Sequence, residues 1–259
     1  MRNLFGQNGI WQHRRLLWRL TINDMKTKYN NTVLGFIWSL LNPILTMLVL
    51  YFIFINFRSR EPHYALFLLT GIISYRFFTQ GSSATLRSII AKSSIVENYA
   101  IPREILVLSA ALSSFISFFL EFTVLVPLVM IVTGVLSWFA FVFPLIHIIY
   151  FLFIYGLGLL LASIYPYFRD LGQIWSIVTQ LGFFACPIIY SIDILPENIL
   201  PYYMLNPIAN FIIMYREIII SGEMPGLWNF LYVILAGVII VFIGSLVFKH
   251  LQRRFVEVI

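Results

Sequence analysis

The sequence predicts an all-α integral membrane protein with six transmembrane helices, an N-terminal amphipathic interface helix and a re-entrant outer-side segment between helices 5 and 6. Composition and the pattern of the apolar runs predict this class. Of the 259 residues, 60% are hydrophobic and only 11% are charged, whereas an average soluble domain is about 25% charged. A chain this apolar has too few polar side chains to wet a folded surface, so lipid must solvate much of it. The apolar runs are unbroken rather than alternating, which indicates helices and excludes a transmembrane β-barrel.

The first 32 residues are expected to form a cytoplasmic interface segment. Within it, residues 10–29 carry large apolar side chains at helical spacing and basic side chains on the other faces. A basic amphipathic helix with tryptophans lies along the membrane plane, with its cations near anionic headgroups. Packing of this helix against other protein is a second reading, which is compatible with the first. The apolar positions are Trp11, Trp18, Ile22, Met25 and Tyr29.

Six stretches are long and apolar enough to cross a bilayer, which takes about 20 mostly apolar residues. The third stretch is longer than a bilayer requires and should tilt or protrude. Together the stretches define a transmembrane domain over 33–248, followed by a cytoplasmic tail at 249–259. The expected spans are 33–57, 64–86, 105–133, 139–165, 173–192 and 228–248.

The basic residues orient the chain in the membrane. With a cytoplasmic N-terminus, 13 of the 17 Lys and Arg residues fall inside and three fall outside, namely Arg58, Arg60 and Arg216. This asymmetry follows the positive-inside rule, so both termini are expected in the cytoplasm. The same rule accounts for the net charge of +6, and nucleic acid is therefore not an expected partner.

The segment between the last two spans, about 193–225, has an unusual composition. Prolines punctuate it, yet 207–220 is apolar apart from Arg216 and Glu217. Because a stretch of 14 residues is too short to cross a bilayer, a re-entrant or interfacial outer segment fits best. Non-helical backbone at membrane depth is tolerated where it lines a wet cavity or is buried in protein. This segment is the candidate outer gate.

Two ionisable residues lie inside expected spans, Arg76 in the second and Glu121 in the third. Such residues are costly in lipid, face a bundle interior or cavity, and often pair. Opposite running directions of the two spans place both residues near mid-depth. A buried ion pair and a polar strip along a substrate path are both open readings. Outward snorkelling of Arg76 is the alternative to both.

The sequence carries no motif of an enzyme. Its four histidines are scattered without ligand spacing, so no metal site is predicted. It has no phosphate-binding G-x-x-x-x-G-K-[ST] loop and no paired acidic motif for Mg²⁺. The single cysteine, Cys186, allows no intramolecular disulfide. Neither a catalytic residue nor a cofactor is therefore expected in this chain.

Two cytoplasmic loops hold clustered polar residues. Each could be an ordinary solvated loop or a docking surface for a cytoplasmic partner, and the sequence leaves both interpretations open. The residues are Glu97, Asn98, Tyr99, Pro102, Arg103 and Glu104 in the first loop, and Arg169 and Asp170 in the second.

Several motifs, in order and nearly along the whole chain, resemble the type-2 ABC exporter permeases. More narrowly, they are similar to permeases that export lipid-linked polysaccharide, namely O-antigen, capsule or teichoic acid. The motifs are Asp24-Met25-Lys26-Thr27-Lys28-Tyr29, Thr32-Val33-Leu34-Gly35 with Trp38, the 64–71 run with Tyr75 and Phe77-Phe78, Tyr99-Ala100-Ile101-Pro102-Arg103-Glu104-Ile105-Leu106 with Leu108-Ser109, Tyr167-Phe168-Arg169-Asp170-Leu171, Pro187-Ile188-Ile189-Tyr190, Leu205-Asn206-Pro207 and Tyr215-Arg216.

The resemblance implies a permease in the cytoplasmic (inner) membrane that forms a homodimer and docks two copies of a separate ABC ATPase, which would hold ATP and Mg²⁺. It implies that 10–29 is the interface helix, that the 97–104 loop contacts the ATPase, and that a lipid-linked glycan moves along an aromatic path. Arginine at position 76 departs from the neutral polar residue of many relatives, which leaves the local path chemistry open. The implied path residues are Trp38, Tyr51, Tyr75, Phe183, Phe184 and Tyr190, and the implied outer-gate residues are Asn206, Pro207, Tyr215 and Arg216.

Two rival functions stay open from the sequence. One is an ABC permease for drugs or other lipids, in which a channel facing the bilayer is too narrow for a sugar chain. The other is a secondary transporter or a membrane-bound transferase, neither of which needs an ATPase.

Overall fold

The computed structural model describes residues 10–29, 35–55, 63–99, 101–134, 138–252 and 255, and within these ranges the chain is helical with no strand. Parts of the expected interface segment (1–9 and 30–32), of the first span (33–34 and 56–57) and of the tail (253–254 and 256–259) lie outside the described residues.

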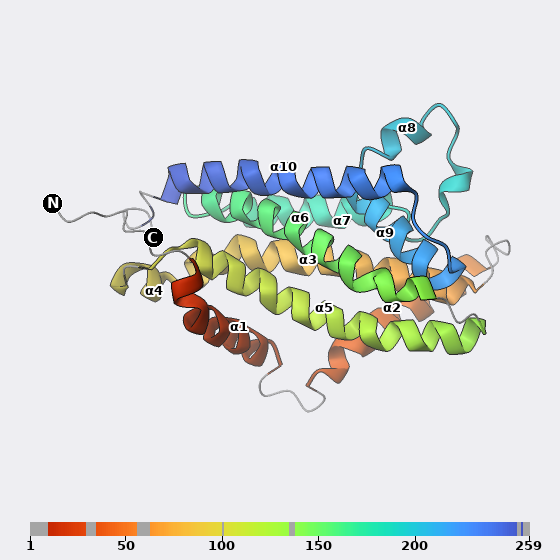
Figure 1. Ribbon diagram of the computed structural model, residues 1–259, viewed down its shortest axis with the longest axis horizontal. Helices are drawn as coiled ribbons and strands as arrows, with labels where there is room; N and C mark the ends of the chain where they lie inside the picture. Colours follow the sequence, from red (N-terminus) through yellow and green to blue (C-terminus); the bar gives the residue numbers. More distant parts are fainter. Residues whose placement is uncertain are drawn as a thin grey trace.

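The long helices run side by side along the long axis of the molecule (Figure 1). They are α2 (Ile37–Phe54), α3 (Tyr64–Ala91), α5 (Glu104–Thr133), α6 (Phe143–Ile164), α7 (Leu171–Ala185) and α10 (Leu227–Leu251). The shorter elements are η1 (Ile10–His13), α1 (Arg14–Tyr29), α4 (Ser93–Asn98), η3 (Trp138–Val142), η4 (Ile192–Ile194), α8 (Leu200–Tyr203), α9 (Pro207–Arg216) and the π-helical η5 (Glu217–Ser221).

Four described segments are long and apolar enough to cross a membrane: α2, α5, η3 with α6, and α10. These correspond to the first, third, fourth and sixth expected spans. Membrane-spanning character is therefore confirmed, while length and composition together single out four segments and not six. The remaining expected spans correspond to α3 and α7, which fall short for different reasons.

The helix α3 is long enough, at 28 residues, but carries many polar side chains. Most of its residues are buried by its neighbours α5, α6, α2, α9 and α7. Hydroxyl groups on α3, such as those of Ser82, Thr85 and Ser88, donate to carbonyls of the preceding turn. Because protein rather than lipid surrounds this helix, and these three hydroxyl groups bond to its own backbone, a moderately polar composition is tolerated.

The helix α7 has 15 residues, which makes it about 22 Å long and shorter than the roughly 30 Å of a hydrocarbon core. It ends at Ala185, since Cys186 is extended and Pro187 follows it. The residue before a proline is pushed out of the helical region, which explains the stop. The expected span 173–192 is therefore helical only as far as Ala185.

Small residues allow α6 and α10 to approach closely. A side-chain carbon on Gly156 of α6 would meet the backbone of Ile240 and Val241, and one on Gly244 of α10 would meet the carbonyl of Gly156. Contacts between small residues are the usual way for membrane helices to pack without a hydrophobic driving force.

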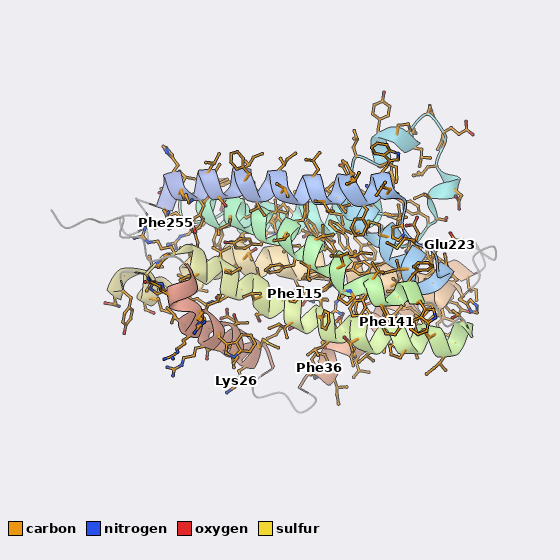
Figure 2. The ribbon with its side chains drawn as sticks, viewed as in Figure 1. Lys26, Phe36, Phe115, Phe141, Glu223 and Phe255 are labelled. Atoms are coloured by element: carbon orange, nitrogen blue, oxygen red, sulfur yellow. The ribbon has the colours of Figure 1, made fainter. Side chains whose placement is uncertain are left out.

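The bundle has two distinct ends. The helix α4, the beginning of α1 and the C-terminal part of α10 lie at one end, and α8 lies at the other (Figure 1). We call these the α4 end and the α8 end. Figure 2 shows nitrogen-bearing side chains around α1, with Lys26 among them, toward the α4 end. The two polar loops of the sequence analysis, 97–104 and 167–170, both lie at the α4 end because each joins helices that turn there.

Candidate functional site

The first polar loop presents an exposed surface at the α4 end. Glu97 and Asn98 end α4 and are exposed, and Tyr99 is 66% exposed. Pro102, Arg103 and Glu104 are half-buried because they lead into α5. A tyrosine this exposed at a helix end contributes little to the core, so it is available to a protein partner.

The second loop is tied to the end of α10 and to Arg103. The Tyr167 hydroxyl donates to the Leu251 carbonyl over 2.8 Å, and Arg103 donates to the Gln252 carbonyl. The Arg103 guanidinium also lies 5.7 Å from the centre of the Phe255 ring. Arg169 and Asp170 stay exposed. The structure therefore brings Arg103 and the 167–170 loop together with the end of α10.

The helix α1 is joined to this end of the bundle by an ion pair that sequence reasoning missed. Lys92, between α3 and α4, places its Nζ 2.6 Å from Asp24 Oδ2 and also donates to Ser109 Oγ of α5 over 2.8 Å. Burial lowers the pKa of Lys92, while the hydrogen bond and charge of Asp24 act in the opposite direction. Leu20 and Thr21 on the inner face of α1 are buried. Lys92 therefore joins α1 to the end of α3 and to α5.

The two ionisable residues of the spans lie together. Arg76 Nη1 is 3.5 Å from Glu121 Oε2 and donates to the Ser39 carbonyl over 3.1 Å. The Arg76 guanidinium also lies 5.8 Å from the centre of the Phe118 ring. Glu121 is fully buried, while 17% of the Arg76 side chain is exposed. Arg76 is therefore paired with Glu121 and also partly exposed. Its side chain points toward α5 and α2 and does not snorkel outward.

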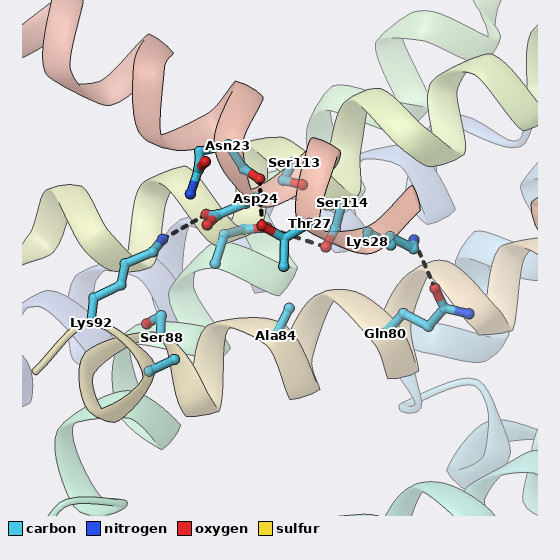
Figure 3. Close-up of a pocket in the computed structure, with 12 residues that line it drawn as sticks. Asn23, Asp24, Thr27, Lys28, Gln80, Ala84, Ser88, Lys92, Ser113 and Ser114 are labelled. Atoms are coloured by element: carbon cyan, nitrogen blue, oxygen red, sulfur yellow. Dashed lines mark hydrogen bonds and ion pairs between the residues drawn. The ribbon is translucent and has the colours of Figure 1, made fainter. Parts of the chain in front are cut away.

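Two adjoining cavities open between α1 and α3. The larger, about 490 Å³, is bounded by α1, α3 and α5, with Asp24, Lys28 and Lys92 on its walls (Figure 3). The smaller, about 260 Å³, lies between Lys28, the start of α2 and Arg76. Lys28 and Gln80 line both cavities, and Lys28 Nζ donates to Gln80 Oε1 over 3.1 Å.

The six aromatic residues implied as path residues differ in exposure within this chain. Trp38 is 50% exposed and Phe184 is 64% exposed. Tyr75 is buried between α3 and α7, where its hydroxyl donates to the Thr179 carbonyl and its ring packs on Phe183. Tyr51 and Tyr190 are half-buried, with Tyr51 against Tyr64 and Tyr190 bonded to Tyr203.

The implied outer-gate residues meet near the α8 end, where Arg216 joins three segments. Its Nη2 donates to the carbonyls of Ile188 and Phe67 over 2.9 and 3.1 Å, and its Nη1 donates to the Pro187 carbonyl. The guanidinium stacks on the Phe67 ring at 3.4 Å from its centre. Arg216 therefore fastens α9 to α3 and to the chain that leaves α7.

The other gate residues fix the direction of α9. Asn206 caps the helix by accepting from the Ile208 amide, and Pro207 occupies its first turn. The hydroxyl oxygen of the fully buried Tyr215 lies 2.9 Å from His147 Nδ1. The other ring nitrogen of His147, Nε2, lies 3.2 Å from the Phe115 carbonyl oxygen. Sequence reasoning did not connect His147 to the gate, since nothing local marks its partner 68 residues away.

No cluster of metal-ligating residues occurs in the part of the chain that the structure describes. A sequence model of the ABC-2 type transporter family matches residues 15–220. This chain belongs to the ABC-2 type transporter family. The resemblance to type-2 ABC permeases is thereby confirmed, and the matched segment extends from α1 through the outer segment, including Lys92, Arg76 and Arg216.

Relatives within the family cover almost the whole chain. The O-antigen export system permease protein RfbA of Klebsiella pneumoniae is 30% identical over 250 residues, which is 94% of this chain and 95% of the relative. The capsule polysaccharide export inner-membrane protein CtrC of Neisseria meningitidis serogroup A is 21% identical and covers 93% and 92%. The polysialic acid transport protein KpsM of Escherichia coli is 21% identical and covers 89% and 91%.

Proposed function

We propose that this chain is the permease subunit of an ABC transporter that exports lipid-linked polysaccharide across the cytoplasmic membrane. The observation that carries the proposal is the 30% identity to an O-antigen export permease along 94% of the chain. Relatives named for capsule and polysialic acid export favour the same substrate class over drugs or other lipids. Membership of an ABC transporter family disfavours a secondary transporter and a transferase.

In the proposed topology the chain crosses the membrane six times with the α4 end in the cytoplasm. The length of α3, about 42 Å for 28 residues, is sufficient for the second crossing. The fifth crossing would combine α7 with the extended chain that follows Ala185. Burial of α9 among α3 and its neighbours supports a re-entrant rather than a surface segment.

The proposed partner is a pair of ABC ATPase subunits bound at the α4 end. The exposed residues Glu97, Asn98 and Tyr99, with Arg169 and Asp170, offer a polar surface there. ATP and Mg²⁺ would be held by the ATPase, which agrees with the lack of a phosphate-binding loop in this sequence. Because Lys92 and Arg103 tie this surface to α1, α5 and the end of α10, closure of the ATPases would move these helices together.

A second copy of the chain is proposed to complete the path. The helices α2 and α7 both pack on α3 and leave large apolar faces exposed, with Trp38 on α2 and Phe184 on α7. Aromatic rings suit the C–H faces of sugars. A wet path between two copies would spare a glycan the loss of water at every hydroxyl.

The experiment that tests the proposal combines binding with ATP hydrolysis. The chain is co-expressed with ABC ATPase subunits from its own organism, purified through a tag on the permease, and assayed in lipid nanodiscs. We expect an ATPase to co-purify and its hydrolysis rate to rise several-fold with a lipid-linked glycan, but not with the same glycan freed from its lipid. Stimulation by drugs alone, or no associated ATPase, would overturn the proposal.

A further inference from the structure

The smaller of the two cavities is an opening on the side of the bundle. Its walls are the end of α1, the first turns of α2 and the middle of α3, contributed by Lys28, Trp38, Asn42, Arg76 and Gln80. We call this cavity the lateral port. The port opens near the middle of α3. Arg76 lies 12 residues, about 18 Å, from the Tyr64 end of this helix and 15 residues, about 22 Å, from its Ala91 end.

The charges of the lateral port favour an anion. Lys28 and Arg76 both line it, and no carboxylate does so among the described residues. Glu121 pairs with Arg76 from the opposite side, and it is fully buried, so it orients the guanidinium without reaching the cavity. Burial lowers the pKa of Lys28, an effect that the charge of Glu121 opposes and that of Arg76 reinforces. A bound anion would act in the same direction as Glu121 and favour the charged form of Lys28.

The neutral residues of the port suit a phosphate ester with polar groups beside it. The amides of Asn42 and Gln80 face the same cavity as the two cations, and Trp38 stands at its rim, half exposed. Arginine binds phosphate oxygens in pairs and lysine binds them as a point charge. The indole of Trp38 is amphipathic, so it suits a rim where a polar group meets hydrocarbon.

The surroundings of the port indicate that the phosphate belongs to a lipid. On α2, Leu45 and Leu48 follow Asn42 of the port by three and six residues and are exposed, so a hydrocarbon chain can stay in the bilayer while the headgroup enters. On α1, exposed Arg15, Arg19 and Lys26 raise the local concentration of anionic headgroups. A soluble phosphate compound would gain nothing from the apolar rim.

From this geometry we propose that the lateral port binds the phosphate group of a membrane lipid, with Lys28 and Arg76 as its contacts. Two lipids share this chemistry. One is a polyprenyl diphosphate carrying a glycan, a case that rests on the proposed function, and there the larger cavity with Lys92 and Ser113 would take the polar part beyond the phosphates (Figure 3). The other is an anionic glycerophospholipid of the surrounding membrane.

Native mass spectrometry of the full chain in detergent tests this inference. The probes are undecaprenyl diphosphate, phosphatidylglycerol and, as a phosphate-free reference, undecaprenol. The port variants are Lys28→Gln and the double variant Arg76→Gln/Glu121→Gln, which leaves no unpaired buried charge. The matched control is Lys26→Gln, which removes the same charge two residues away from an exposed position outside both cavities. Thermal unfolding in the same detergent shows that each variant is folded.

We expect at least one phosphate lipid to bind about tenfold more weakly to both port variants, and equally well to Lys26→Gln and the unaltered chain. If the port variants bind only undecaprenyl diphosphate more weakly, the port is a substrate site. If they bind only phosphatidylglycerol more weakly, it is a site for a membrane lipid. Both results uphold the inference. Equal binding by port variants and control, or equal binding of undecaprenol, overturns it. Because this assay needs no ATPase and no transport, its outcome is separate from that of the proposed function.

Discussion

Arg76 on α3 lies 3.5 Å from the carboxylate of Glu121 on α5 while it donates to the carbonyl of Ser39 on α2. One side chain thus connects three helices at the middle depth of the bundle. The pair has the two properties that make an intramembrane charge tolerable, namely a partner and a cavity. Mutation can therefore measure what the pair contributes to stability separately from what Arg76 contributes to the lateral port.

Replacing Arg76 alone should destabilise the protein more than replacing both partners. Arg76→Ala removes the ion-pair partner of the fully buried Glu121, and breaking a buried pair in this way costs about 3–5 kcal/mol. The double variant Arg76→Ala/Glu121→Ala also removes the buried carboxylate and should recover part of the loss. Thermal unfolding in detergent measures both, with the exposed Arg87→Ala on the same helix as the control. A double variant at least as unstable as Arg76→Ala would contradict the pairing.

Substituting Arg216 should loosen the outer segment. Arg216→Lys keeps the charge but has all its donors on one nitrogen, so it cannot reproduce the planar fork that reaches the carbonyls of Phe67, Pro187 and Ile188. Cys186, the only cysteine in the sequence, is 1% exposed and precedes Pro187, so it reports on this site. We expect a thiol reagent to label Cys186 several-fold faster in Arg216→Lys. The control, Arg169→Lys at the α4 end, should label at the original rate, and unchanged labelling in Arg216→Lys would show that the arginine does not hold the segment closed.

Substitutions at the α4 end should weaken association with the ATPase without unfolding the chain. Glu97 and Tyr99 are exposed, so the double variant Glu97→Ala/Tyr99→Ala removes little packing. Its matched control is Glu197→Ala/Tyr202→Ala, which makes the same changes in exposed residues toward the α8 end. Co-purification of the ATPase should fall several-fold only for the first variant. An equal fall for both variants would remove the basis for assigning the contact to this loop.

Lys92 should give the stability of the protein a defined alkaline pH dependence. Its pKa is lowered from 10.5 by burial, so between the two pKa values the unfolded chain binds more protons than the folded one. The free energy of unfolding therefore rises with pH in that window. The free energy of unfolding of the unaltered chain, minus that of Lys92→Met, should rise as pH increases toward 10.5 and level off above it. A difference that shrinks over this range would contradict the pKa direction.

Long apolar runs made much of the architecture predictable. All six expected spans begin within four residues of a described helix, namely α2, α3, α5, α6, α7 and α10. Arg76 and Glu121 were recognisable because a charge inside an apolar run is unusual and implies a partner. Hydropathy did not predict the full length of α3, because its last turns, to Ala91, are stabilised by burial against neighbouring helices.

Contacts between polar segments were not predictable in the same way. Asp24 and Lys92 each lie in a segment where charge is ordinary, so their pairing across 68 residues left no local signal. Likewise Tyr75 and Trp38 are both aromatic residues of helices, yet one is buried and the other half exposed. Their orientation depends on how α2, α3 and α7 pack, which periodicity alone does not determine.

The central claim is that an attached ATPase drives a lipid-linked glycan through this permease. Its most direct test is uptake of a radiolabelled lipid-linked glycan into inverted membrane vesicles that contain the permease and its ATPase. We predict uptake that requires ATP, stops when the catalytic glutamate of the ATPase is replaced, and falls in Glu97→Ala/Tyr99→Ala but not in Glu197→Ala/Tyr202→Ala. Uptake by vesicles that hold the permease alone, driven by an ion gradient, would contradict the claim.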